Sequence, residues 1–222
     1  MPLPCCTKLA EVDVMPVIAL VGNKGGAGKT TLAVNLAAGL ARSSSVAMID
    51  ADPQGSALQW SAITGDAAAP SVSVAEADLQ RQAVKLLQDY DWLVIDCPPS
   101  VHAPQTGAVL GFGDLALIPV QPSPMDLWAS VHIEQSIEEA HKLNSSLRTL
   151  LVINQLEPRT TLSRLVRDAL SEIAFPVADT AVRRRAIYRA SALQGKSVFD
   201  MGRRGADAAD EIDQLIQEVT IV

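Results

Sequence analysis

The chain has 222 residues, of which 48% are hydrophobic, and its formal net charge is −7. This length and apolar content suffice for one domain with a substantial core, and no apolar run is long enough to cross a membrane. A net negative charge by itself argues against a nucleic-acid-binding protein, and three cysteines are too few for a disulfide framework or a zinc site. The opening residues lack the apolar stretch of a secretory signal, so we expect a cytoplasmic protein.

The first predicted strand, Val17–Val21, is followed by the run Gly22-Asn23-Lys24-Gly25-Gly26-Ala27-Gly28-Lys29-Thr30-Thr31. A glycine-rich turn between a buried strand and a helix directs backbone N–H groups and the positive end of the helix dipole at one point, which is typical of a phosphate site. The spacing places Lys29 within reach of the β- and γ-phosphates and the Thr30 hydroxyl beside Mg²⁺. The run therefore predicts a nucleoside triphosphate site. A glycine-rich turn with two solvated lysines is the alternative.

Two departures make this loop more specific. Asn23 replaces the first glycine of the usual motif, and Lys24 precedes the double glycine. Lys24 comes too early in the turn to serve the phosphates of its own subunit in the usual way. In this feature the sequence resembles the deviant Walker A family of ATPases, which comprises ParA, MinD and their relatives. The resemblance implies that Lys24 contacts the phosphates of the partner subunit in an ATP-bound homodimer.

The next predicted strand, Val46–Asp50, leads into Ala51, Asp52 and Pro53. Alternate side chains of a strand lie on the same side, so we expect Asp50 and Asp52 to face the sheet edge at which the phosphate loop opens. In ParA relatives this segment is the first switch, which implies that Asp52 orients the attacking water and that Asp50 lies near Mg²⁺. The alternative is a turn that only caps the strand.

Phosphoryl transfer depends mostly on positioning and on stabilisation of charge. One water-orienting carboxylate and two lysines are therefore a plausible minimal catalytic set. In this chain the set is Lys24, Lys29 and Asp52.

A strand over 71–74 and an amphipathic helix over 78–89 are predicted next, with Leu79, Val84 and Leu87 on the inner face of the helix.

The apolar run Trp92–Ile95 ends in Asp96, which is typical of a buried parallel strand that carries the Walker B carboxylate. We expect Asp96 to hold Mg²⁺ through a bound water, because this ion gives up its hydration reluctantly. Cys97 lies inside the motif and is interpreted as a small buried hydrophobic residue rather than a metal or redox site. Pro98 and Pro99 end the strand and stiffen the following loop, which corresponds in the family to the second switch.

Periodicity in the rest of the chain predicts helices over 103–110, 126–143, 160–173 and 206–219, and strands over 115–120 and 150–154. The repeated alternation indicates an α/β protein with a parallel twisted sheet and helices on both faces, a P-loop NTPase of the deviant Walker A type. Asn154 ends the last strand at the edge of the phosphate loop. The resemblance implies contact with adenine, and a strand-terminating cap is an equally good interpretation.

The net charge conceals a basic region between residues 183 and 204, where Asp200 is the one acidic residue. Such a patch can neutralise several phosphates and bind DNA without sequence preference and with strong salt dependence. In the ParA family, basic residues in these regions hold non-specific double-stranded DNA in the ATP-bound dimer. A solvated basic face is the alternative. The candidate DNA-binding residues are Arg183, Arg184, Arg185, Arg189, Lys196, Arg203 and Arg204.

The C-terminal helix distinguishes this chain from MinD-like relatives, which attach to membranes by a basic amphipathic terminal helix. Here the predicted helix is acidic and would be repelled by anionic lipid. Its apolar residues fit a stripe that faces the core, and we expect no membrane partner. These residues are Ile212, Leu215, Ile216 and Val219.

The resemblance runs from Met15 onward and is to the short ParA branch, which includes ParF-like partition ATPases and McdA-like carboxysome-positioning ATPases. Because relatives begin near Met15, we expect a single ATPase domain over 15–222. Residues 1–14 are then a disordered extension or the product of an upstream start, and a partner-binding tail is the alternative.

The resemblance implies an ATPase that is weak alone, uses ATP and Mg²⁺, associates with the nucleoid and is stimulated by a ParB- or McdB-like adaptor protein. Its cargo would be a plasmid, a chromosome origin or a protein organelle such as the carboxysome. A metabolic or metallocentre-assembly ATPase that uses the same loop without DNA is the alternative function.

Overall fold

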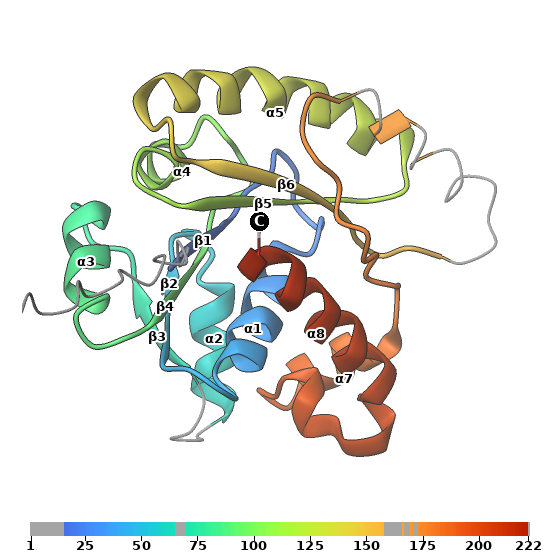
Figure 1. Ribbon diagram of the computed structural model, residues 1–222. Helices are drawn as coiled ribbons and strands as arrows, with labels where there is room; N and C mark the ends of the chain where they lie inside the picture. The colour runs from blue at the N-terminus through green and yellow to red at the C-terminus, as the bar shows by residue number, and fades with distance from the viewer. Residues whose placement is uncertain (1–15, 65–69, 158–165, 167–168, 171–172, 222) are drawn as a thin grey trace, which may run out of the picture.

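The computed structural model describes residues 16–64, 70–157, 166, 169–170 and 173–221 (Figure 1). One six-stranded sheet in the order β3-β2-β4-β1-β5-β6 forms its centre, and all strand pairs are parallel. Near-continuous apolar strands predicted this arrangement, because strands of a parallel sheet are covered on both faces. The strands are β1 (Val17–Leu20), β2 (Val46–Asp50), β3 (Ser71–Val74), β4 (Trp92–Asp96), β5 (Leu115–Val120) and β6 (Arg148–Ile153).

Helices cover both faces of the sheet (Figure 1). Alternate residues of β1 show the division, since Ile18 and Leu20 belong to one apolar core while Val17 and Ala19 belong to the other. The first core includes residues of α1, α2, α7 and α8, and the second includes residues of α3, α4 and α5. The helices are α1 (Lys29–Leu40), α2 (Ser56–Thr64), α3 (Leu79–Leu86), α4 (Pro104–Leu110), α5 (Pro124–Leu143), α7 (Ala186–Ala192) and α8 (Ala206–Ile221), with a 3₁₀ segment η1 (Val198–Arg204).

The acidic terminal helix packs as expected. Ile212, Leu215 and Val219 are fully buried in α8, and Ile216 packs against the same core. No helix among the described residues is long and apolar enough to cross a membrane.

The prediction of which residues lie on the inner face of α3 is partly wrong. In α3, Leu79 and Ala83 are buried, whereas Val84 is 58% exposed. The buried stripe follows the i, i+4 spacing from Leu79, so the side chain one position after Ala83 points away from the sheet. Leu87 follows the helix and packs against the core as expected.

Two expectations concern segments that the structure does not describe, or describes only at single positions. Residues 1–14, the expected extension, lie outside the described residues. Most of the helix expected over 160–173 does so too, although Val166 and Leu170 are buried there.

Candidate nucleotide-binding site

The phosphate loop connects β1 to α1, and two of its glycines have left-handed backbone angles. The φ angles are 81° at Gly26 and 90° at Gly28. A Cβ added to Gly28 would overlap the side-chain amide of Asn154, so both conformation and space require glycine there. The loop ends where α1 begins, at Lys29. Backbone N–H groups and the helix dipole therefore meet at this point, as phosphate binding needs.

Three side-chain amides from the ends of β5 and β6 hold the carbonyl groups of this loop. Gln121 and Gln155 both donate from Nε2 to the Gly26 oxygen. Asn154 donates from Nδ2 to the Ala27 oxygen over 2.7 Å, and its Oδ1 accepts the Gln155 N–H. Asn154 thus supports the loop and terminates the strand in this structure, while its contact with adenine stays a prediction. The roles of Gln121 and Gln155 carry no sequence signal, because only the fold brings these strand ends to the loop.

Asn23 has a structural function in place of the usual glycine. Its Oδ1 accepts the backbone N–H of Val101 over 2.9 Å, and Val101 lies in the segment that follows β4. The side chain therefore ties the phosphate loop to the segment expected to be the second switch.

The predicted Mg²⁺ side of the site is formed by Thr30 and Asp96. The Thr30 hydroxyl donates to Asp96 Oδ2 over 2.6 Å, and the Asp96 side chain is fully buried. Burial raises the pKa of Asp96 to about 7, with the Thr30 hydrogen bond and the charge of Lys29 opposing that rise. Asp96 Oδ1 has no hydrogen-bond partner among the described residues. This oxygen fits a ligand shell of Mg²⁺, directly or through a bound water.

Asp50 lies on the strand beside Asp96, with which it is in register. It accepts the backbone N–H groups of Asp52 and Leu58, and burial raises its pKa despite these bonds. Asp52 is half-buried and accepts the Gln54 N–H over 3.0 Å. Both carboxylates thus lie at the sheet edge where they were expected, and the turn after β2 is also present.

Lys29 is buried among these carboxylates. Burial lowers its pKa, and the charges of Asp96 and Asp52 oppose that shift. Its Nζ donates to the backbone oxygen of Lys24 over 3.2 Å. Among the described residues no three His, Cys, Asp or Glu side chains cluster as a metal site. Mg²⁺ bound here would take its remaining ligands from nucleotide phosphates and water.

A cavity of about 160 Å³ adjoins the loop on the side of α7. Gly28 and Thr31 line one side of it, and Val182 and Tyr188 line the other. The Tyr188 hydroxyl is buried and has no hydrogen-bond partner among the described residues. Four of the candidate DNA-binding arginines also line this cavity: Arg183, Arg184, Arg185 and Arg189.

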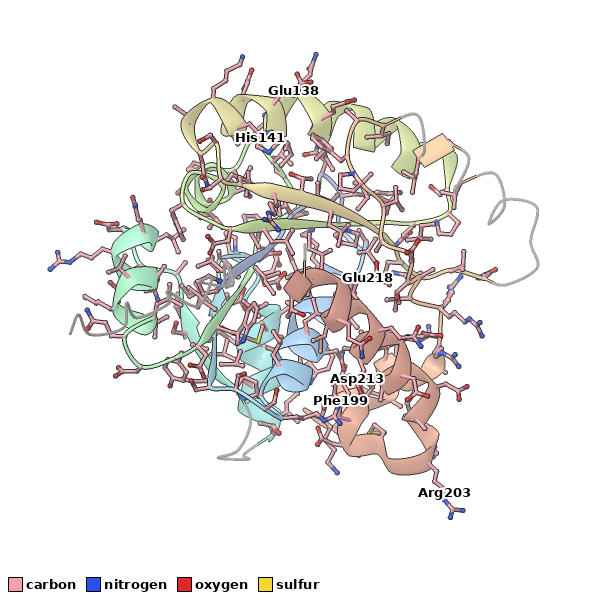
Figure 2. All side chains as sticks on the ribbon, in the orientation of Figure 1. Glu138, His141, Phe199, Arg203, Asp213 and Glu218 are labelled. Carbon is pink, nitrogen blue, oxygen red and sulfur yellow. The ribbon has the colours of Figure 1, made fainter. Side chains whose placement is uncertain are left out.

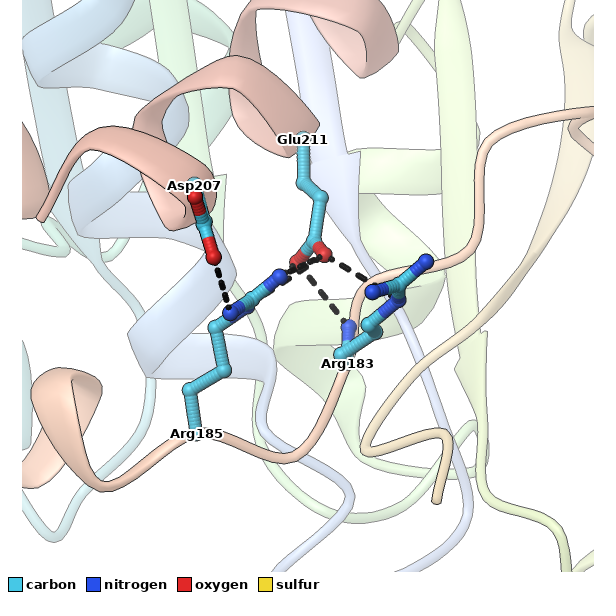
Figure 3. Close-up of polar contacts among 4 residues, drawn as sticks. All are labelled: Arg183, Arg185, Asp207 and Glu211. Carbon is cyan, nitrogen blue, oxygen red and sulfur yellow. Dashed lines mark hydrogen bonds and ion pairs between the residues drawn. The ribbon is translucent and has the colours of Figure 1, made fainter. Parts of the chain in front are cut away.

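The fold supplies acidic partners that the local sequence does not reveal. Arg185 donates to Glu211 over 2.7 Å and to Asp207 over 3.0 Å, and Arg183 lies 3.5 Å from Glu211 (Figure 3). Both acids belong to α8. Arg184 pairs with Glu157 over 2.6 Å. The side chain of Arg185 is 23% exposed, so this arginine is a structural tie between the start of α7 and α8.

The other four basic residues are exposed and have no ion pair within the described part of the chain. Arg203 projects from η1 away from the body of the molecule (Figure 2). The four are Arg189, Lys196, Arg203 and Arg204.

Comparisons with known proteins agree with this geometry. Residues 18–198 match the family described as CobQ/CobB/MinD/ParA nucleotide binding domain. "Maintenance of carboxysome distribution protein A" from Halothiobacillus neapolitanus is 43% identical over 206 residues, covering 91% of this chain and 95% of that protein. The structure of a Cyanothece McdA(D38A)–ATP complex has a TM-score of 0.68 at 18% identity, covering 94% and 97% of the two chains. Cobyrinic acid a,c-diamide synthase from Mycobacterium smegmatis with ADP and magnesium has a TM-score of 0.73 at 22% identity, covering 91% and 94%.

Proposed function

Because the chain belongs to the CobQ/CobB/MinD/ParA nucleotide-binding family, we propose that it is a ParA-type ATPase that positions carboxysomes over the nucleoid. The observation that carries the choice of cargo is the 43% identity, over nearly the whole chain, to a protein named for maintaining carboxysome distribution. In this proposal the chain dimerises with Mg²⁺–ATP, binds non-specific DNA and releases it after hydrolysis. A ParB- or McdB-like adaptor on the cargo stimulates that hydrolysis.

The residues of the site have distinct roles in this cycle. Lys29 binds the β- and γ-phosphates, and backbone N–H groups of the loop hold the phosphate oxygens. Thr30 and Asp96 would hold Mg²⁺, with Asp50 beside them, and the bound ion would supply positive charge next to the phosphates. Asp52 orients the attacking water. Lys24 stabilises the phosphates of the partner subunit.

DNA binding by the dimer is supported by the exposed basic residues of α7 and η1. Arg203 and Arg204 lie on η1, which packs against α7 and α8. Two subunits would present this surface twice, and the affinity for a polyanion rises with each phosphate that is neutralised. The net charge of −7 belongs to the chain as a whole, whereas the segment 183–204 contains seven basic residues and one acidic residue, Asp200.

The first test measures binding of the purified protein to a non-specific DNA duplex without nucleotide, with ADP, with ATP and with a slowly hydrolysed ATP analogue. We expect tight DNA binding only with ATP or its analogue, and we expect the DNA affinity to fall steeply as the salt concentration rises. Absence of DNA binding in every state, with ATP still bound, would favour a metabolic or metallocentre-assembly ATPase.

The second test addresses the dimer. Lys24→Ala should abolish ATP-dependent dimerisation in light scattering, whereas Lys85→Ala, which removes an exposed lysine of α3, should leave it unchanged.

A variant of the proposed water-orienting residue tests hydrolysis. Asp52→Ala should give a dimer that persists on DNA with slow ATP turnover. Normal dimerisation of the Lys24 variant, or normal turnover of the Asp52 variant, would remove that residue from its proposed role.

The third test concerns the cargo. Deletion of the protein from its host should cluster carboxysomes, and a fluorescent fusion should follow the nucleoid. Evenly spaced carboxysomes in the deletion strain would point to a plasmid or chromosome origin as cargo.

A further inference from the structure

The segment Asn154–Glu157 leaves β6 and contacts two separate parts of the molecule. Its first two side chains reach the phosphate loop. Its last two residues contact the arginine segment, which we define as Val182–Arg185. The segment therefore links the nucleotide site to the candidate DNA-binding arginines through hydrogen bonds and one ion pair.

On the loop side, Gln155 is held in an unusual conformation. Its φ angle is 56°, and it is the one residue other than glycine with a positive φ in the described part of the chain. A left-handed backbone costs about 1 kcal/mol or more for such a residue, so it persists only where surrounding contacts enforce it. Two contacts do so here. Gln155 Nε2 donates to the Gly26 oxygen over 2.9 Å, and the Gln155 N–H donates to Asn154 Oδ1 over 2.9 Å.

On the arginine side, Leu156 pairs with Arg183 as an isolated parallel bridge. The Leu156 N–H donates to the Val182 oxygen over 3.0 Å, and the Arg184 N–H donates to the Leu156 oxygen over 3.0 Å. The Arg184 guanidinium in turn pairs with Glu157 over 2.6 Å. Residues 156–157 thus hold the backbone of Val182–Arg184 on one side, together with the Ile153 oxygen, which accepts the Val182 N–H, and Glu211, which accepts the Arg183 N–H.

The two sides also face each other across the cavity of about 160 Å³ beside the loop. Gly28 and Thr31 line it from the loop and α1, and the arginine segment lines it from the opposite side. Asn154 and Gln155 line the same cavity, so the residues that hold the loop also face the arginine segment.

We infer that Gln155 is a positioning residue that couples the phosphate loop to the arginine segment, so that the nucleotide state of the loop sets how Arg183 and Arg184 are presented to DNA. A nucleotide that moves the Gly26 carbonyl breaks the hydrogen bond from the Gln155 side-chain amide, and the strained backbone then relaxes to an ordinary conformation. That relaxation displaces Leu156 and the arginines paired with it. The strained and relaxed forms are the two states that such coupling requires. The inference rests on the proposed DNA binding.

The test compares Gln155→Gly with Gln121→Ala. Both remove an amide donor to the same Gly26 oxygen, but Gln121 is not adjacent to the arginine segment. Glycine adopts a positive φ without strain, so Gln155→Gly keeps the fold while it removes the amide and the conformational restraint. The measured quantity is the ratio of DNA dissociation constants without nucleotide and with a slowly hydrolysed ATP analogue.

Coupling between sites typically changes affinity by about 5- to 150-fold, and we expect the wild-type ratio in that range. Gln155→Gly should lower this ratio by about fivefold or more, the lower end of that range, and leave the part that dimerisation contributes. Gln121→Ala should weaken nucleotide binding by about fivefold, as for one lost hydrogen bond, and leave the ratio unchanged. By reciprocity, DNA should tighten nucleotide binding to the wild type and to Gln121→Ala more than to Gln155→Gly, by the same factor.

An unchanged ratio in Gln155→Gly, or an equal loss in both variants, would overturn the inference. Failure of the proposed function is separable from this outcome, because it appears as wild-type protein that binds no DNA in any state. In that case hydrogen exchange tests the coupling directly. The ATP analogue should change protection of the Leu156 and Arg184 amides in the wild type but not in Gln155→Gly, and equal changes in both proteins would refute it.

Discussion

The Asp96 carboxyl group is buried at the end of a central strand, and one of its two oxygens has a single hydrogen bond, from Thr30. Burial without a full set of partners raises its pKa to about 7. The other oxygen, Oδ1, has no hydrogen-bond partner among the described residues. It is available for the proposed Mg²⁺ site, at the expense of the stability of the nucleotide-free protein.

Replacement of this carboxyl should therefore change how stability depends on pH. Below about pH 4 Asp96 is protonated in both the folded and the unfolded states. Between about pH 4 and 7 only the unfolded state ionises freely, so the free energy of unfolding of the wild type falls as pH rises and then levels off. Relative to the wild type, Asp96→Asn should gain up to about 4 kcal/mol across this window, as measured by urea unfolding of the nucleotide-free protein.

Asp91 provides the control. It is fully exposed, and its hydrogen bonds from Ser45 lower its pKa. Asp91→Asn should lose stability relative to the wild type as pH rises toward the ordinary pKa of Asp, which is the opposite sign, and the difference should stay constant above it. A stability difference between Asp96→Asn and the wild type that does not vary with pH would contradict the raised pKa of Asp96.

At the scale of elements, the turn between α7 and η1 packs closely on the end of α2. Trp60 of α2 donates from Nε1 to the Lys196 oxygen over 3.1 Å. Gly195 has a φ of 65°, and a Cβ added there would overlap the backbone of Thr64. This contact joins the C-terminal helices to α2, which follows the Asp52 turn.

Gly195→Ala should destabilise the protein for two reasons. A left-handed alanine costs about 1 kcal/mol, and the overlap with backbone atoms adds to that cost because α2 cannot move without disturbing the sheet. Gly55→Ala separates the two effects, since Gly55 has the same φ of 65° but open space around its Cβ position. Chemical denaturation should show a clearly larger loss for Gly195→Ala, and equal losses would show that the packing contact contributes nothing.

Across the whole molecule, the basic residues of the C-terminal region divide into two groups. Arg185 is paired to α8 and contributes to the fold, and its neighbour Arg183 shares the same acid. Arg203 and Arg204 are exposed, with no ion pair among the described residues. The two groups should respond differently to substitution.

Arg203→Ala should weaken DNA binding and reduce the salt slope by about one, with an unchanged melting temperature. Arg185→Ala should lower the free energy of unfolding by about 1–2 kcal/mol, because Glu211 is 12% exposed and loses its closest partner. DNA titrations at several salt concentrations and thermal unfolding distinguish the two. A stability loss for Arg203→Ala with unchanged DNA affinity would reverse this division.

The sheet, the phosphate loop and the carboxylates at the sheet edge could all be predicted from the sequence alone. The comparisons confirm the predicted family and its nucleotide-hydrolysing class, and structures of the same fold hold ATP or magnesium, the predicted cofactors. These features were predictable because each depends on a short run of consecutive residues. An apolar strand, a glycine turn and a strand-end aspartate such as Asp96 specify their local geometry, and parallel strands then gather at one edge.

Contacts between side chains of separate elements could not be predicted in this way, and they became visible in the folded protein. The Gln121 and Gln155 amides reach the Gly26 carbonyl because β5 and β6 end beside the loop. Arg185 is neutralised by Glu211, 26 residues further along the chain. The exposure of Val84 likewise depends on how α3 is rotated against the sheet. Local periodicity and charge counts contain none of this information, because such contacts depend on the packing of elements that lie far apart in the chain.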